Sequence, residues 1–102
     1  MKKFIVGDRV SLSKEALSIS YIACRSFYTN MYEGKQGKVI GYAETGKVAV
    51  EFDDKVFTDP GRISSHNNGC HGRGKKNYCW YIPEECLSLI NKTIDTNLLL
   101  LV

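Results

Sequence analysis

Both histidines and three of the four cysteines of this 102-residue chain fall in one stretch, SSHNNGCHGRGKKNYCWYIPEECLSL, residues 64–89. Zinc sites in proteins use four Cys or His side chains in a tetrahedron, and this stretch offers His66, Cys70, His71 and Cys79. The spacing lacks a C-x-x-C pair, and adjacent residues such as Cys70 and His71 rarely bind one ion. We therefore expect packed thiols and no cofactor, with a zinc-stapled structural module on these four residues as an alternative.

Cys70 and His71 are also the residue types of a nucleophile and its base. Arg73, Lys75 and Lys76 follow closely, and positive charge favours the thiolate form of cysteine. Adjacent residues in a loop are not held in nucleophile–base geometry, and the sequence offers no evident acid to orient His71. We therefore expect a protein that is not an enzyme.

The same stretch has the composition of a binding surface. A strand over residues 78–82 places Tyr78 and Trp80 on one face, and Cys79 and Tyr81 on the other. With Trp80 outward, aromatic platforms lie beside cations, which suits stacking on bases or gripping an acidic peptide. With Trp80 inward it anchors the core, and the usual burial of tryptophan slightly favours this arrangement. The candidate binding residues are His66, His71, Arg73, Lys75, Lys76, Tyr78 and Trp80.

Short strands are predicted to position this stretch. Residues 9–12 alternate after a Gly-Asp turn, and AETG at residues 43–46 reads as the turn of a hairpin. In its second strand Val48, Val50 and Phe52 point inward, while Lys47, Ala49 and Glu51 point outward. Pro83 ends the strand over 78–82, and a tight turn leads to a last strand near residues 86–90. The predicted core contains Val10, Val39, Val48, Val50, Phe52, Ile82 and either Leu87 or Leu89.

Two long connections interrupt these strands. Residues 13–33 show both helical and alternating spacing, which predicts a long connection with one or two helical turns. Residues 60–77 are rich in Gly, Asn, Ser and basic side chains, and loops of this length are usually functional or disordered. We expect this basic loop to be mobile until a partner orders it.

The motifs VGDRV, GKQGKVIGY, KVAVEFDD and CWYIPEECLSLI resemble small SH3-like barrel modules of the KOW, Mind bomb and CAP-Gly kind. They are most similar to short phage-encoded barrel proteins, over roughly residues 6–90. The resemblance implies an all-β, five-stranded SH3-like barrel, with a long basic loop before the fourth strand. The domain would span residues 1–90, followed by a tail over 91–102. It also implies a phage- or mobile-element-encoded protein that binds a host protein and inhibits a host factor or defence system.

Charge and length bear on the class of partner. The net charge is +3, and the basic residues of 62–76 follow an acidic group at 51–59. This split favours a charged protein surface over a phosphate backbone, with nucleic acid as the alternative partner. The apolar runs FIV and LLLLV are too short for a leader or a membrane span, so we expect a cytoplasmic protein without a membrane partner. The Leu-rich tail is a candidate for an extra edge strand or a homodimer contact.

Overall fold

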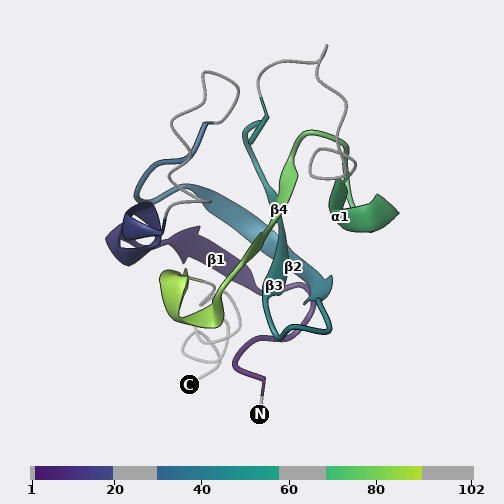
Figure 1. Ribbon diagram of the computed structural model, residues 1–102, viewed down its shortest axis with the longest axis horizontal. Helices are drawn as coiled ribbons and strands as arrows, with labels where there is room; N and C mark the ends of the chain where they lie inside the picture. Colours follow the sequence, from purple (N-terminus) through teal and green to yellow (C-terminus); the bar gives the residue numbers. More distant parts are fainter. Residues whose placement is uncertain (1, 20–29, 58–68, 91–102) are drawn as a thin grey trace, which may run out of the picture.

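The computed structural model describes residues 2–19, 30–57 and 69–90, which form one five-stranded antiparallel sheet. The strands are β1 (Arg9–Leu12), β2 (Gln36–Tyr42), β3 (Val48–Phe52), β4 (Cys79–Ile82) and β5 (Leu87–Leu89). Neighbouring strands follow the order β4-β3-β2-β1-β5, so β5 returns to pair with β1 (Figure 1). The prediction of a small all-β domain with five strands is confirmed.

Within the described residues, three short helical elements connect the strands. They are the 3-10 helices η1 (Lys14–Ser18) and η3 (Glu84–Cys86) and the short helix α1 (Gly69–Gly72). Helix η1 confirms that the first long connection contains a short helical turn, although residues 20–29 of that connection lie outside the described residues. Helix η3 follows Pro83 and fills the tight turn that was predicted between the last two strands.

The β2–β3 hairpin forms where the glycine-marked turn predicts it. The amide of Ala43 donates to the carbonyl of Lys47 at 2.8 Å, and Gly46 supplies the positive φ of 91° that the turn needs. The turn end of the hairpin is fixed by Tyr42, the last residue of β2, whose hydroxyl donates to Glu84 and accepts the amide of Phe4 at 2.9 Å. The hairpin tip is therefore held at a set position relative to η3.

One face of the sheet covers the main core. Every residue predicted to be buried is buried, with Leu87 rather than Leu89 as the buried residue of β5. Leu89 shares the face of Leu87 and lies opposite Val10, but it is the last residue of this edge strand and is 42% exposed. Trp80 is only 7% exposed and lies against Phe57, with ring centroids 5.1 Å apart. The arrangement with Trp80 inward is therefore the one adopted.

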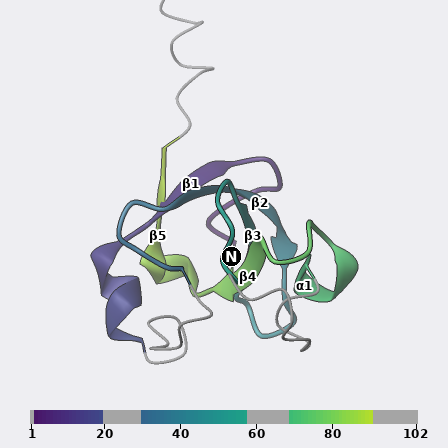
Figure 2. The same ribbon diagram turned by 90° about the horizontal axis from the view of Figure 1, so that it is seen from above.

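A second, smaller cluster lies on the other face of β3 and β4. It contains Ala49, Cys70 and Cys79. The alternating pattern placed Ala49 on the face opposite Val48 and Val50, where it lies, but α1 covers that face and Ala49 is completely buried. Figures 1 and 2 show α1 beside the β3–β4 side of the sheet, away from η1.

Lys35 is a buried charged residue that the sequence did not indicate. It is 1% exposed, and its Nζ donates to the carbonyl of Lys55 at 3.1 Å. The ammonium also lies over the rings of Tyr32 and Phe52, at 4.9 and 5.7 Å from their centroids. Burial lowers the pKa of Lys35, and the nearby carboxylates of Asp54 and Asp53 oppose this shift.

The predicted tail, residues 91–102, lies outside the described residues, as does its suggested homodimer contact. Within the described ranges no helix has the length and apolar character to span a membrane.

Gly37 in β2 is predicted to be irreplaceable, because a Cβ there would lie 2.6 Å from the carbonyl oxygen of Glu51 and 2.8 Å from the Cα of Phe52. We expect Gly37→Ala to lower the free energy of unfolding by about 1–3 kcal/mol, since the backbone of β3 would have to move. Gly41→Ala is the matched control, because its nearest contact is the Arg73 side chain at 3.5 Å. Equal urea midpoints for the two variants would contradict the close approach of β2 and β3.

Lys35 is predicted to give stability a pH dependence. Its pKa is lower in the folded chain than in the unfolded chain, so between those two values the unfolded state binds more protons. The stability of wild type should therefore rise, relative to Lys35→Met, as pH increases toward the ordinary lysine pKa of about 10.4. Lys38→Met, which replaces an exposed lysine of β2, is the control and should show no such difference. Parallel pH profiles for wild type and Lys35→Met would count against a buried ammonium.

Candidate functional site

The candidate site begins with an unusual backbone turn. All four residues of α1 have positive φ, with 81° at Gly69, 56° at Cys70, 60° at His71 and 83° at Gly72. With ψ values of 58° and 39° for Cys70 and His71, this is a left-handed turn. Glycine adopts this conformation without strain, whereas Cys70 and His71 do so at a cost. The amide of Gly74 closes the turn on the carbonyl of Gly69 at 2.8 Å.

Close packing holds this turn against the sheet. A Cβ on Gly74 would lie 2.5 Å from the Sγ of Cys79 and 2.8 Å from both Glu51 Oε1 and Ile40 Cδ1, so only glycine fits there. Glu51, on the same face of β3 as Ala49, accepts the amide of Lys75 at 3.0 Å through Oε1. The loop from 69 to 77 is thus fixed by contacts within the chain. We expected a partner to order the whole basic loop, but residues 69–77 are ordered by these contacts without one. The rest of that loop, up to residue 68, lies outside the described residues.

Two thiols meet beneath the turn. Cys70 and Cys79 are both free and buried in one cluster, and the Sγ of Cys79 donates to the carbonyl of Lys75 at 3.3 Å. The neighbouring Cys79 side chain and burial both raise the pKa of Cys70, so this thiol stays protonated. The Cys70 side chain lowers the pKa of Cys79, against the opposing effects of burial and of Glu51. Cys79 is therefore the thiol of the pair that loses its proton more readily.

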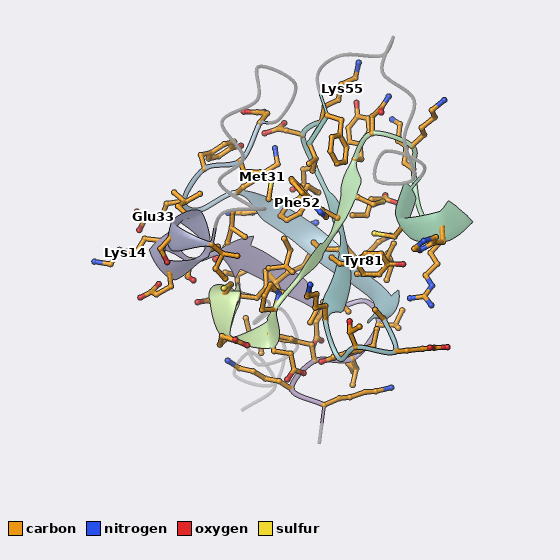
Figure 3. The ribbon with its side chains drawn as sticks, viewed as in Figure 1. Lys14, Met31, Glu33, Phe52, Lys55 and Tyr81 are labelled. Atoms are coloured by element: carbon orange, nitrogen blue, oxygen red, sulfur yellow. The ribbon has the colours of Figure 1, made fainter. Side chains whose placement is uncertain are left out.

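The side chains that follow Cys70 reach β4 and the end of β2. His71 Nδ1 lies 2.7 Å from the hydroxyl of Tyr81, and their ring centroids are 5.7 Å apart. Arg73 donates from Nη1 to the carbonyl of Tyr42 at 2.8 Å. Burial raises the pKa of Tyr81, with Cys70 adding to the rise and Arg73 opposing it. Figure 3 shows Tyr81 on the side of β4 that faces α1.

These side chains surround an open groove of about 630 Å³. One wall is the hairpin tip and the other is α1 with β4. Lys47 and Arg73 bring positive charge from the two walls, and Trp80 and Tyr81 supply aromatic surface between them. The residues lining the groove are Ala43, Glu44, Thr45, Lys47, His71, Arg73, Trp80 and Tyr81.

The groove contains only part of the predicted binding set. His71, Arg73 and Trp80 line it, although Trp80 reaches it from the core. Lys75 instead packs on Tyr78, with its Nζ 4.2 Å from the ring centroid, and Lys76 is exposed outside the groove. His66 lies outside the described residues. The predicted surface is therefore divided, with one part in the groove and another on the 75–78 turn.

The sequence prediction missed the hairpin-tip residues of the groove and Tyr81, and of these Lys47 and Tyr81 carry the chemistry. Tyr81 shares a strand face with Cys79. Because side chains alternate along β4, an inward Trp80 indicates that Tyr81 points to the outer face, where the groove lies. Lys47 carries no local signal, because it enters the site only through the docking of α1 beside the hairpin.

The acidic residues of 51–59 do not form an uncommitted surface in the described part of the chain. Asp53 pairs with Arg9, with contacts of 3.0 and 2.5 Å, and Asp54 accepts the hydroxyl of Tyr32 at 2.6 Å. Glu51 is used to hold the loop. These carboxylates are thus occupied in stabilising the fold.

Metal binding has little support in the described geometry. Across residues 2–19, 30–57 and 69–90, no three Cys, His, Asp or Glu side chains gather as a metal site would require. Cys70 and Cys79 are together, but His71 is directed to Tyr81. The four-residue zinc alternative also includes His66, outside these ranges.

No family model, curated protein or solved structure matches this chain. Inference about its function therefore starts from the groove and the thiol pair themselves.

Glu51 is predicted to control access to the two thiols. Removing its carboxylate in Glu51→Ala leaves the amide of Lys75 without its acceptor, so α1 should open more often. We expect alkylation of Cys70 and Cys79 by iodoacetamide to become about tenfold faster or more under native conditions. Glu33→Ala, at an exposed position, should leave the rate unchanged. An unchanged rate in Glu51→Ala would show that Glu51 does not hold the turn closed.

Proposed function

We propose that this protein is a non-enzymatic binding module whose groove takes an acidic segment of a partner protein. The observation that supports this is the convergence of Lys47 and Arg73, from two separate elements, on a groove with aromatic surface. A guanidinium has five N–H donors, and the Tyr42 carbonyl takes one of those of Arg73, which leaves donors for a carboxylate. Trp80 and Tyr81 would contact the apolar parts of the same segment.

A protein partner fits this arrangement better than a nucleic acid. The groove is short, is bordered by Glu44, and does not include the basic residues Lys75 and Lys76. A phosphate backbone is best matched by a continuous basic track, whereas one acidic segment needs only a few well-placed cations. Nucleic acid remains the second candidate because Lys75, Lys76 and Tyr78 place cations beside an aromatic ring on the neighbouring turn.

We also infer that the fold is an SH3-like barrel of the kind that the sequence motifs resemble. Two features support this: the strand order β4-β3-β2-β1-β5, and the 3-10 turn η3 between β4 and β5. The resemblance to short phage-encoded barrels supports a host protein as the partner, with inhibition of a host factor or defence system as the result. Such a module would act in the host cytoplasm.

Charge reversal in the groove tests the proposed function. Wild type, Arg73→Glu and Lys47→Glu would each be immobilised and exposed to bacterial lysate, with and without nuclease treatment. We expect an acidic protein to be captured by wild type after nuclease treatment, and its affinity to fall about tenfold or more in each variant. Lys76→Glu is the matched control, since Lys76 is exposed outside the groove.

The second candidate makes the opposite prediction. If nucleic acid is the partner, nuclease treatment should abolish capture, and wild type should bind DNA or RNA at low salt. Changing Arg73, Lys75 and Lys76 together to Ala should then weaken binding and flatten its salt dependence. If binding is weakened in this triple variant and is unchanged in Lys47→Glu, the functional surface is the 75–78 turn and not the groove.

A further inference from the structure

We propose that Cys70 and Cys79 form a reversible disulfide that ties α1 to β4. The two thiols lie in one buried cluster with Ala49, on the face of the sheet that α1 covers. They are the two free cysteines that this cluster contains, whereas Cys86 lies in the main core on the opposite face of the sheet. The structure thus sets apart one pair for bond formation.

The chain between the two cysteines is already folded back on itself. The amide of Gly74 contacts the carbonyl of Gly69 at 2.8 Å, and that of Tyr78 contacts Lys75 at 3.1 Å. Cys79 lies opposite Glu51 on β3, on the face that α1 covers. Because these contacts hold both ends of the loop, a bond between the sulfurs needs adjustment of side chains more than refolding of the backbone.

The chemistry is thiol–disulfide exchange with a small-molecule disulfide such as oxidised glutathione. The Cys79 thiolate attacks one sulfur of the small disulfide, which forms a mixed disulfide and releases the first small thiol. Cys70 then loses its proton and attacks the Cys79 sulfur, which releases the second small thiol. Two protein thiols have become one disulfide, and one small disulfide has become two thiols, so electrons and atoms balance.

Access to Cys79 requires α1 to open. Cys79 is fully buried and Cys70 is 3% exposed, so the closed turn protects both from bulky reagents. The turn is one four-residue element, its residues His71 and Gly72 and the following Arg73 are exposed, and Cys70 and His71 hold a strained left-handed backbone. Such an element can open locally without unfolding of the sheet.

A disulfide here would also fix the groove. His71 and Arg73 follow Cys70 directly and form one wall of the groove, so a covalent tie at Cys70 would hold that wall in place. This consequence rests on the proposed function, whereas the disulfide itself does not. Disulfide mapping therefore tests the disulfide alone, and partner capture tests the proposed function alone, so either result can be negative without the other.

The test uses the full chain in buffers with increasing ratios of oxidised to reduced glutathione. After trapping of free thiols with iodoacetamide, mass spectrometry of proteolytic peptides identifies the linked cysteines. We expect a Cys70–Cys79 link, with a mass loss of two hydrogens, while Cys24 and Cys86 remain alkylated. The oxidised protein should also melt higher than the reduced protein, by on the order of 10 °C. Dithiothreitol should reverse both changes.

Matched variants keep the proposal falsifiable. Cys70→Gly removes the thiol while suiting the positive φ, so it should fold, form no link and show no oxidation-dependent shift in melting. Cys24→Ser should behave as wild type. The proposal is overturned if Cys70 and Cys79 stay unlinked at the most oxidising ratio, if they carry stable glutathione adducts, or if the link joins Cys24 or Cys86. It is also overturned if the link forms equally well in denaturant.

Discussion

Ala49 leaves room on the outer face of β3 for the thiols of Cys70 and Cys79, and this contact seats α1 against the sheet. One step along the same face, Glu51 accepts the amide of Lys75 and fixes the chain as it leaves the turn. A larger residue at 49 would lift α1 away, and with it the wall of the groove that carries Arg73. The position of every groove residue that α1 contributes therefore depends on one small side chain and one carboxylate, neither of which lines the groove itself.

This contact gives the short sheet two buried faces at β3. Val48, Ala49 and Val50 are all inaccessible, although a five-stranded domain of this size usually keeps one face of its sheet in water. Lys35, directly before β2, also adds buried contacts. Its aliphatic stem fills space, and its ammonium links the connection before β2 to Lys55 in the segment after β3. The domain thus adds to a modest core by covering surface that small β domains normally expose.

Sequence alone predicted the parts of the fold that follow from local pattern. The alternation of Val48, Val50 and Phe52 and the glycine-marked turn defined the hairpin, and Pro83 marked the end of β4. The same rule placed Ala49 on the outer face, but it gave no sign that α1 covers this face, because alanine is compatible with either a buried or an exposed environment. Lys35 was missed because its charge predicts exposure, and its burial depends on rings supplied by Tyr32 and Phe52. In the candidate site, His71 and Arg73 could be proposed from composition, but their meeting with Lys47 depends on how α1 docks beside the hairpin.

The left-handed turn also bears on how this protein should be engineered. Cys70 and His71 each occupy a backbone conformation that costs an L-amino acid roughly 1–2 kcal/mol and costs glycine almost nothing. At His71, which is exposed, selection for thermostability alone would favour glycine, whereas at Cys70 the relief of strain is opposed by loss of the buried thiol that seats α1. A glycine at 71 would keep the sheet and lose the imidazole that lies beside Tyr81. Screens that rank variants of this domain by melting temperature would thus discard the imidazole and keep the thiol.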